Sequence, residues 1–240
     1  MRNNLLSIAA FSMLLFISCG EVRLKGKGSV VTTERQTGSF SSIDIAAPVK
    51  AIITIQEGAP TLNLTGYENL LKHIRVTTKD NKLTIELEEG VNWNSDQQVT
   101  ANITLPSLQA IELEGAVQAD VKGTVTGSKL DCDMSGGTQL KLQSVQTAAV
   151  NVEISGAGDF RVEDGHSENV SYEISGSGKV YAYGLQANNV SAGVSGAGFM
   201  QLTALKKLKV DITGAGNISY KGNPAIQKEV TGAGALHAAN

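Results

Sequence analysis

The stretch EISGAGDF, residues Glu153–Phe160, decides the fold because near-copies of it recur along the chain. EISGSGKV, GVSGAGFM, DITGAGNI and EVTGAGAL follow it, each built around a Ser/Thr-Gly-small-Gly tetrapeptide. The tetrapeptides begin at Ser135, Ser155, Ser175, Ser195, Thr213 and Thr231, which are 20, 20, 20, 18 and 18 residues apart. Such a short and nearly constant period is typical of a solenoid, in which each repeat is one coil.

Apolar and polar residues alternate on both sides of the tetrapeptide, as in strands that bury one face. The position directly before it reads Leu113, Met134, Ile154, Ile174, Val194, Ile212 and Val230. The first apolar position after it reads Leu140, Phe160, Val180, Met200, Ile218 and Leu236. Stacked coils place like residues over like, about 4.8 Å apart. The sequence therefore predicts an all-β fold, a parallel β-helix with aliphatic columns inside.

Because the tetrapeptide separates two strands of one coil, we predict that it forms a corner. Glycine adopts positive φ angles that strain other residues, so it suits such a turn. The predicted corner residues are Ser135, Gly136, Ser155, Gly156, Gly158, Ser175, Gly176, Gly178, Ser195, Gly196, Gly198, Thr213, Gly214, Gly216, Thr231, Gly232 and Gly234. A phosphate-binding loop is the alternative, but it requires one glycine loop ahead of a helix.

The chain divides into two parts of unequal regularity. Residues 106–240 hold the regular repeats, whereas residues 30–105 are rich in strands but less regular. Residues 67–74, YENLLKHI, favour a short helix or an irregular connection. We expect the first part to supply opening coils that stack continuously on the second; a separate N-terminal β-domain is the alternative.

The N-terminal 18 residues have the pattern of a signal peptide. Arg2 is followed by an apolar stretch over residues 5–17 and then by FISCG. This pattern predicts a lipoprotein signal, with Cys19 as the lipidated first residue of the mature chain. Residues 19–29 are then expected to form a polar tether to the membrane, and a plain cleaved signal is the alternative. Cys132 lies in an alternating run and is predicted to be a small buried apolar residue.

Charge and composition exclude several classes of function. The formal net charge is −3, and no basic patch of the kind that binds nucleic acid stands out. The three histidines, His73, His166 and His237, are far apart and predict no metal cluster. The sequence indicates no cofactor.

Several further motifs resemble a known family. SFSSIDIAAPVKAIITIQEG, NLLKHIRVTTKDNKLTIEL, ITLPSLQAIELEGA and the repeated SGAG occur in the order found in the head GIN domain of "putative auto-transporter adhesins". The resemblance covers roughly residues 38–220. It implies a right-handed β-helix and an envelope lipoprotein with an adhesin-like function, and it supplies no catalytic residues.

The outward positions of the repeats carry a column of acids. It consists of Glu112, Asp133, Glu153, Glu173, Asp211 and Glu229, with Gly193 in the place of one acid. Stacked like charges repel one another, and no neutralising partner stands out in the sequence. We interpret the column as a solvated face that blocks sideways strand pairing. A ladder of carboxylate and hydroxyl oxygens that binds hard cations such as Ca²⁺ is the alternative.

An enzyme that acts on polysaccharides is a weaker alternative. Such a β-helix enzyme usually has a cleft with convergent acids and with basic residues beside them. In this chain the basic residues look scattered over the second strand of the repeats: Lys141, Arg161, Lys179 and Lys221. The serines of the tetrapeptides lack a histidine partner. Trp93, in a polar loop, looks exposed; we expect it to pack locally, and stacking on a sugar is the alternative.

The sequence thus predicts a non-enzymatic lipoprotein of the outer membrane, held by its N-terminal lipid on the periplasmic or the cell-surface side. Its faces or the loop at residues 90–96 are expected to bind a glycan or a protein ligand. A structural β-helix that associates end to end is the alternative, because residues 226–240 run to the last residue without a capping helix, although Lys228 interrupts an inward column.

Overall fold

The computed structural model describes residues 22–93 and 99–239. The predicted signal segment, Cys19 and part of the loop at residues 90–96 therefore lie outside the described residues. The elements are β1 (Val22–Leu24), β2 (Val30–Arg35), β3 (Ser42–Ala46), β4 (Val49–Ile55), β5 (Thr61–Tyr67), α1 (Glu68–Leu71), β6 (Ile74–Lys79), β7 (Lys82–Leu87), β8 (Val91–Trp93), β9 (Val99–Leu105), β10 (Ala110–Gly115), β11 (Gln118–Gly136), β12 (Gln139–Gly156), β13 (Asp159–Gly176), β14 (Lys179–Gly196), β15 (Phe199–Gly214), β16 (Asn217–Lys221), β17 (Ala225–Gly232) and β18 (Ala235–Ala238).

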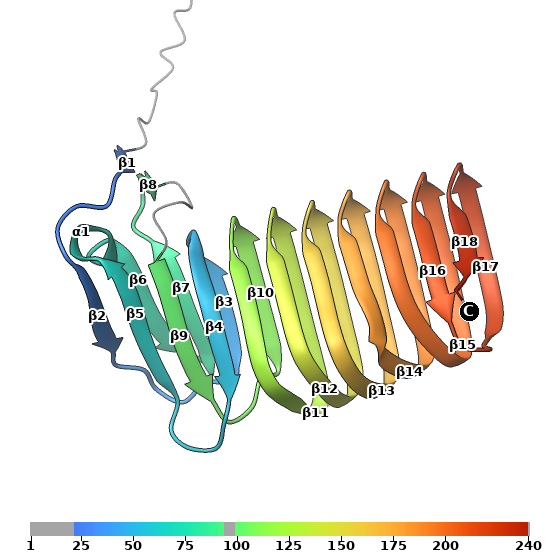
Figure 1. Cartoon of the computed structure of the whole chain (residues 1–240), viewed down its shortest axis with the longest axis horizontal. Helices are drawn as coiled ribbons and strands as arrows, with labels where there is room; N and C mark the ends of the chain where they lie inside the picture. The colour runs from blue at the N-terminus through green and yellow to red at the C-terminus, as the bar shows by residue number, and fades with distance from the viewer. Residues whose placement is uncertain (1–21, 94–98, 240) are drawn as a thin grey trace, which may run out of the picture.

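The strands stack into a β-solenoid of about 6 turns, which confirms the predicted fold class (Figure 1). Strands β10 to β15 pair in parallel, each with the strand of the next coil. Each long strand starts after one tetrapeptide, bends, and ends in the next tetrapeptide. The second strand of one repeat and the first strand of the next are therefore one continuous, bent strand.

The register of the ladders matches the repeat alignment. Ser135, Ser155, Ser175, Ser195, Thr213 and Thr231 are partners on successive coils. Glu114 of β10 pairs with Ser135, so the coil upstream of the first tetrapeptide is in phase as well. The change to shorter steps in the last repeats is absorbed by two register shifts where β14 pairs with β15, between Ala182 and Gln186 and between Ala187 and Asn189.

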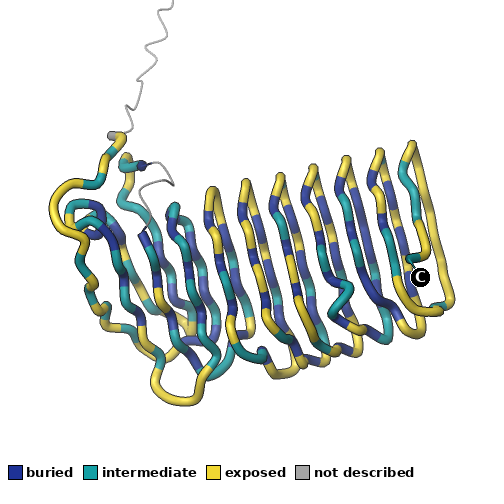
Figure 2. Tube along the Cα trace, in the orientation of Figure 1, coloured by how far each residue is buried: buried dark blue, intermediate teal, exposed yellow. Residues whose placement is uncertain are grey.

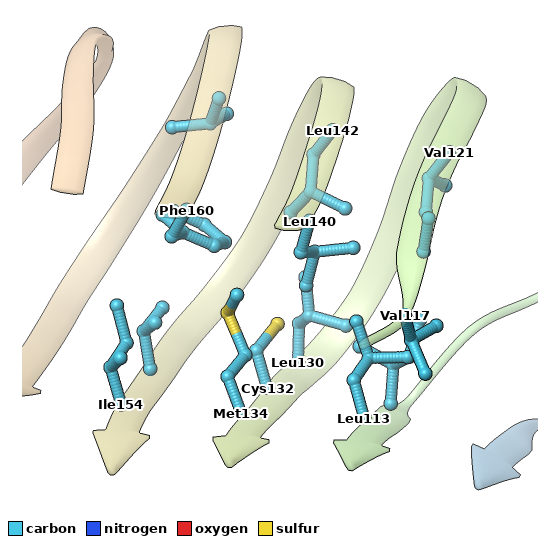
Figure 3. Packing of buried hydrophobic residues seen from close by; sticks show 14 of the residues in the cluster. Leu113, Val117, Val121, Leu130, Cys132, Met134, Leu140, Leu142, Ile154 and Phe160 are labelled. Carbon is cyan, nitrogen blue, oxygen red and sulfur yellow. The ribbon is translucent and has the colours of Figure 1, made fainter. Parts of the chain in front are cut away.

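The apolar columns fill the interior of the solenoid. Figure 3 shows Leu113, Met134 and Ile154 of neighbouring coils beside one another, with Leu140 and Phe160 from the second strands nearby. In Figure 2 buried and exposed positions alternate along the tube of each coil. Burying one aliphatic side chain contributes roughly 1.5–3 kcal/mol, so the columns supply the main stabilising force.

Cys132 belongs to this core, as predicted, with 1% of its surface exposed. Burial raises the pKa of its thiol well above the usual value. The side chain is therefore a neutral apolar group, and it does not act as a nucleophile.

The N-terminal part continues the same sheet but changes its pairing. β3 and β4 extend the solenoid in parallel on β10 and β11. Beyond them, β6 pairs antiparallel with β7, and β5 pairs antiparallel with β2 and β9. β7 and β9 continue the parallel ladders from β3 and β4, whereas β2, β5 and β6 pair antiparallel and cover this end of the solenoid. β1 and β8 form a separate two-stranded sheet. The short helix expected at residues 67–74 is α1.

The structure corrects the predicted tether and the apparent exposure of Trp93. The predicted tether at residues 19–29 contains β1, whose Leu24 pairs with Trp93 of β8. Trp93 looked exposed in the sequence, but only 3% of its surface is accessible; it packs in the core cluster, which confirms the packing role preferred for it. It is therefore a packing residue and does not present its ring to a sugar. Among the residues that the structure describes, no helix is long and apolar enough to cross a membrane.

The last coil is less well covered than the others. Ile226 and Val230 of β17 are 43% and 39% exposed. Lys228, the partner of Val210, is exposed on the same strand. End-to-end association through this coil stays a prediction.

The two glycines of the corner serve different purposes. Gly156 has a φ of 120°, and a Cβ at this position would lie 2.8 Å from the carbonyl oxygen of Gly136. Gly158 does not have a positive φ, but a Cβ there would lie 3.1 Å from Ile154 Cγ2. The amide of Ala157 donates to the Gly136 carbonyl at 2.9 Å, so consecutive corners are hydrogen-bonded to each other.

We expect Gly156→Val to destabilise the protein by about 1–3 kcal/mol, because valine is strained at positive φ and its Cβ would meet the Gly136 carbonyl. A urea titration followed by circular dichroism measures the change. Ala157→Val, at the exposed neighbouring position, is the matched control and should unfold like the wild type. Equal stability of all three proteins would contradict the role assigned to Gly156.

Candidate functional site

The acidic column defines one outer face of the solenoid. The ladders place Glu112, Asp133, Glu153, Glu173, Gly193, Asp211 and Glu229 in register on successive coils. Asp44 of β3 is the partner of Glu112 and extends the column by one more acid. We call this surface the acidic face. The serines and threonines of the corners lie beside the column and are exposed to solvent.

Partial burial and repulsion between carboxylates of neighbouring coils raise the pKa values of several acids in the column. The pKa of Asp133 is raised, first by partial burial and then by the Glu153 carboxylate. The pKa of Glu173 is raised by partial burial and then by Asp211. Asp44 is raised in the same way by partial burial and by Glu112. Stacking these carboxylates therefore costs stability at neutral pH.

Lys82 neutralises one end of the acidic column, a partner that the sequence did not reveal. Its Nζ lies 2.7 Å from Glu112 Oε1 and 3.9 Å from Asp44 Oδ2. The hydrogen bond to Glu112 is the main cause of a raised pKa at Lys82. Lys82 precedes Glu112 by 30 residues and lies on β7, in the irregular part of the chain, so the repeat pattern gave no signal for it.

Gly193 opens a gap in the column. A Cβ at Gly193 would overlap the carboxylate of Glu173, whose side chain lies over the glycine. The gap forms a hollow lined by Glu173, Ser191, Ser195, Lys209 and Asp211. Lys209 lowers the pKa of Glu173 and so offsets part of the repulsion.

Metal coordination through the acidic face stays the alternative to a solvated face. Within the described ranges, no group of three or more His, Cys, Asp or Glu side chains is arranged to hold a metal ion. Neighbouring acids lie one above another along the stack, whereas a cation such as Ca²⁺ takes six to eight converging oxygen ligands.

The basic residues on the second strands, expected to be scattered, gather on another outer face. The ladders bring Asp120, Lys141, Arg161, Tyr181, Gln201 and Ser219 into one outward column. Beside it lies the column Gln118, Gln139, Asp159, Lys179, Phe199 and Asn217. We call these two columns, together with Tyr183 and Lys221, the basic–aromatic face. Aligning the repeats places these basic residues in neighbouring columns, but the acids between them along the chain made them look scattered.

The described residues hold no serine–histidine pair of the kind that a serine hydrolase uses. His166 pairs in register with Gln146 and Gln186, away from the serine column. His73 Nδ1 lies 2.9 Å from Glu88 Oε2 at the N-terminal end. In the described parts of the chain, no hydrogen bond joins a corner serine to a histidine, and a serine nucleophile requires such a base.

Comparison with known proteins agrees with this architecture. The family model "Putative auto-transporter adhesin, head GIN domain" matches residues 39–224. A solved "putative adhesin" from Bacteroides fragilis is similar, with 24% identity, a TM-score of 0.81, and coverage of 90% of this chain and 98% of that one. No curated protein is a significant match.

Two structures from Parabacteroides share the fold as well. A "putative lipid binding protein" from Parabacteroides distasonis has 21% identity and a TM-score of 0.76, covering 91% of this chain and 100% of that one. A "putative adhesin" from Parabacteroides merdae has 23% identity and a TM-score of 0.70, covering 91% and 99%.

Neutralising the acidic column should stabilise the protein at neutral pH. Because the folded-state pKa of Asp133 and of Glu173 is raised, protonation favours the fold; this contribution is fully present below the unfolded pKa near 4 and is lost as pH rises through the folded pKa. We expect Asp133→Asn with Glu173→Gln to raise the Tm by about 1–3 °C at pH 7 and to bring no gain near pH 3. Scanning calorimetry at both pH values measures this, with Glu57→Gln in an exposed loop as the control. A lower Tm at pH 7 would count against repulsion within the column.

Millimolar Ca²⁺ should leave the Tm of the wild-type protein unchanged, because a ligand stabilises a fold only by binding to it. A rise in Tm with Ca²⁺ that Glu153→Gln with Glu173→Gln abolishes would instead establish the cation ladder.

Proposed function

The chain belongs to the family described as "Putative auto-transporter adhesin, head GIN domain", and from this membership we propose that it is an adhesin-like binding module of the cell envelope. In this proposal the β-solenoid is a rigid body that presents its outer faces to a ligand. A lipid on Cys19 holds it at the outer membrane.

The filled interior is the observation that carries the proposal. The side chains of the inward columns are buried; in one column Phe160, Val180 and Met200 have no accessible surface. The polar and charged side chains consequently lie on the outside, where the parallel ladders arrange them in flat, continuous faces. A protein of this construction offers its outer surface for recognition, and the hollow beside Gly193 lies on that surface.

The comparisons and the surroundings of the corner serines support a non-enzymatic role. The family and the solved neighbours are described as adhesins. The serines of the corners point to solvent without a histidine base. The "putative lipid binding protein" among the neighbours is no argument for an interior lipid site in this chain, whose interior is filled by apolar side chains.

Envelope location follows from family membership, and the lipid anchor is our finer proposal. The apolar segment before Cys19 has the order of a lipoprotein signal. A lipid on Cys19, close in sequence to β1, places the antiparallel N-terminal cover near the membrane and leaves the regular coils free to extend from it.

Cys19→Ser should release the protein from the membrane fraction into the soluble fraction, because buried acyl chains supply the attachment, at about 0.8 kcal/mol per CH₂ group. Fractionation with a high-salt wash and immunoblotting measures the release. Cys132→Ser, at the buried core cysteine, is the control and should stay with the membrane. Retention of the Cys19 variant in the washed membranes would rule out the lipid as the anchor.

Deletion of the protein should lower the adhesion of its cells to surfaces coated with glycans or matrix proteins. Complementation with the wild type should restore adhesion, whereas complementation with Cys19→Ser should not, since the released protein no longer links the cell to the surface. Counting retained cells under flow measures the effect. Unchanged adhesion to every coating would overturn the proposed function.

A further inference from the structure

Three aromatic side chains lie together on the outside of the solenoid, although aromatic residues make up only 5% of the chain. Tyr181 and Tyr183 are two residues apart on β14, so both side chains are on the same side of the strand. Phe199 lies on β15 of the next coil, and its ring centre is 5.9 Å from that of Tyr181. All three side chains are only partly buried. Packing of the interior therefore does not explain them.

Each tyrosine holds a cation. Arg161 Cζ lies 4.5 Å from the centre of the Tyr181 ring, and Lys221 Nζ lies 4.6 Å from the centre of the Tyr183 ring. The hydroxyl of Tyr183 donates to Ser219 Oγ at 2.8 Å, which fixes this ring. Tyr181 is fixed between Arg161 and Phe199. Cation–π contacts of this kind hold a long side chain in place without neutralising its charge.

Among the described residues, Arg161 and Lys221 have no acidic partner. On this face Lys141 pairs with Glu163 at 2.6 Å. Across residues 22–93 and 99–239, by contrast, Arg161, Lys179 and Lys221 form no ion pair. A guanidinium that stacks on a ring still has its N–H groups at the edge of its plane free for an anion, and their fork matches a carboxylate. Arg161 also lines a hollow with Lys50, Gln139 and Asp159.

We propose that the basic–aromatic face binds an acidic polysaccharide, with Arg161 as the main contact to a sugar carboxylate and Lys221 as a second cation. This inference rests on the proposed adhesin-like function and names its ligand class and its face. Tyr181 is a positioning residue, since it orients Arg161. The amides of Gln201 and Asn217 and the hydroxyl of Ser219 lie in the same columns and suit sugar hydroxyl groups.

Charge density favours a polysaccharide over a nucleic acid. Asp120, Asp159 and Glu163 lie among the cations of this face, and they would repel a polymer with a phosphate at every nucleotide. A uronic acid polymer carries fewer charges per length than duplex DNA. It also has many hydroxyl groups, which donate hydrogen bonds to carboxylates. The acidic face repels the same polymer, so charge complementarity selects one side of the solenoid.

A membrane surface fits this face less well. The exposed large apolar residues in the described chain are Val30, Leu205, Ile226 and Val230, and none belongs to the basic–aromatic face. Phe199 on this face is only partly exposed and packs on Tyr181, whereas insertion into the interface of a bilayer requires well-exposed apolar side chains next to the cations.

Affinity electrophoresis of the full chain, purified in mild detergent, tests the proposal. The gels contain polygalacturonate as the acidic polysaccharide, dextran as the neutral one, and dextran sulfate as a negatively charged polymer without carboxylates. We expect retardation by polygalacturonate and none by dextran. Arg161→Gln should weaken the apparent affinity for polygalacturonate about tenfold, the usual effect of losing one charge-assisted hydrogen bond. Lys206→Gln removes the same charge from an exposed site outside the face and should bind like the wild type.

The role of Tyr181 has its own pair of variants. Tyr181→Ala should weaken binding nearly as much as Arg161→Gln, because the guanidinium is no longer held. Tyr181→Phe keeps the ring and should bind within about twofold of the wild type, since the face of the ring provides the contact. Circular dichroism of both variants shows whether the fold is intact. Equal affinities of these two variants in folded protein would contradict the positioning role.

The remaining outcomes decide between the proposals. Retardation by dextran sulfate alone, or sedimentation only with vesicles of phosphatidylglycerol and phosphatidylcholine, would overturn a uronic acid ligand. If Arg161→Gln leaves binding to polygalacturonate unchanged, the basic–aromatic face is not the binding site. If deletion of the protein still lowers adhesion in those cases, the adhesin-like function stands. If deletion leaves adhesion unchanged while Arg161-dependent binding persists, the ligand assignment stands without the adhesive function.

Discussion

In-register parallel hydrogen bonding between coils is the constraint on which the rest of this structure depends. Each coil pairs with the next so that Ser135 lies over Glu114 and under Ser155. Every position of the repeat is thereby turned into a column of neighbours along the stack. An apolar position becomes part of a continuous core, and a charged position becomes part of a charged face. The corner must also repeat, and only a glycine with a positive φ fits directly against the carbonyl of the corner before it.

The same constraint produces two outer faces of opposite character. Carboxylates on the acidic face cannot move apart, since their strands are fixed at the spacing of a ladder. Their raised pKa values, the ion pairs of Lys82 and the gap at Gly193 are different responses to that proximity. On the basic–aromatic face the ladder instead places Arg161 against Tyr181, where stacking keeps the charge available. The two faces therefore differ in charge, and this difference is the basis of the anionic ligand proposed above.

The similarity to other solved structures is consistent with this view of the fold. The described neighbours are 21–24% identical to this chain, yet their TM-scores are 0.70–0.81. A stacked coil requires apolar residues at inward positions and small residues at its corners, whereas its outward positions are under no such requirement. The fold can therefore be shared while the outer faces, and with them the ligands, differ.

The sequence by itself determined the period, the inward columns, the corners and the family, because each depends on a pattern that repeats within one chain. It also placed the acids in a column and Cys132 in the core. Only the tertiary structure decided the rest. It showed Lys82 beside Glu112, Trp93 buried against the N-terminal cover, antiparallel pairing of β2, β5, β6 and β7, and the cations of the second strands gathered around Tyr181 and Tyr183. The reason is that these contacts join side chains from different coils or from the irregular part of the chain, and their direction and distance are set by packing in three dimensions.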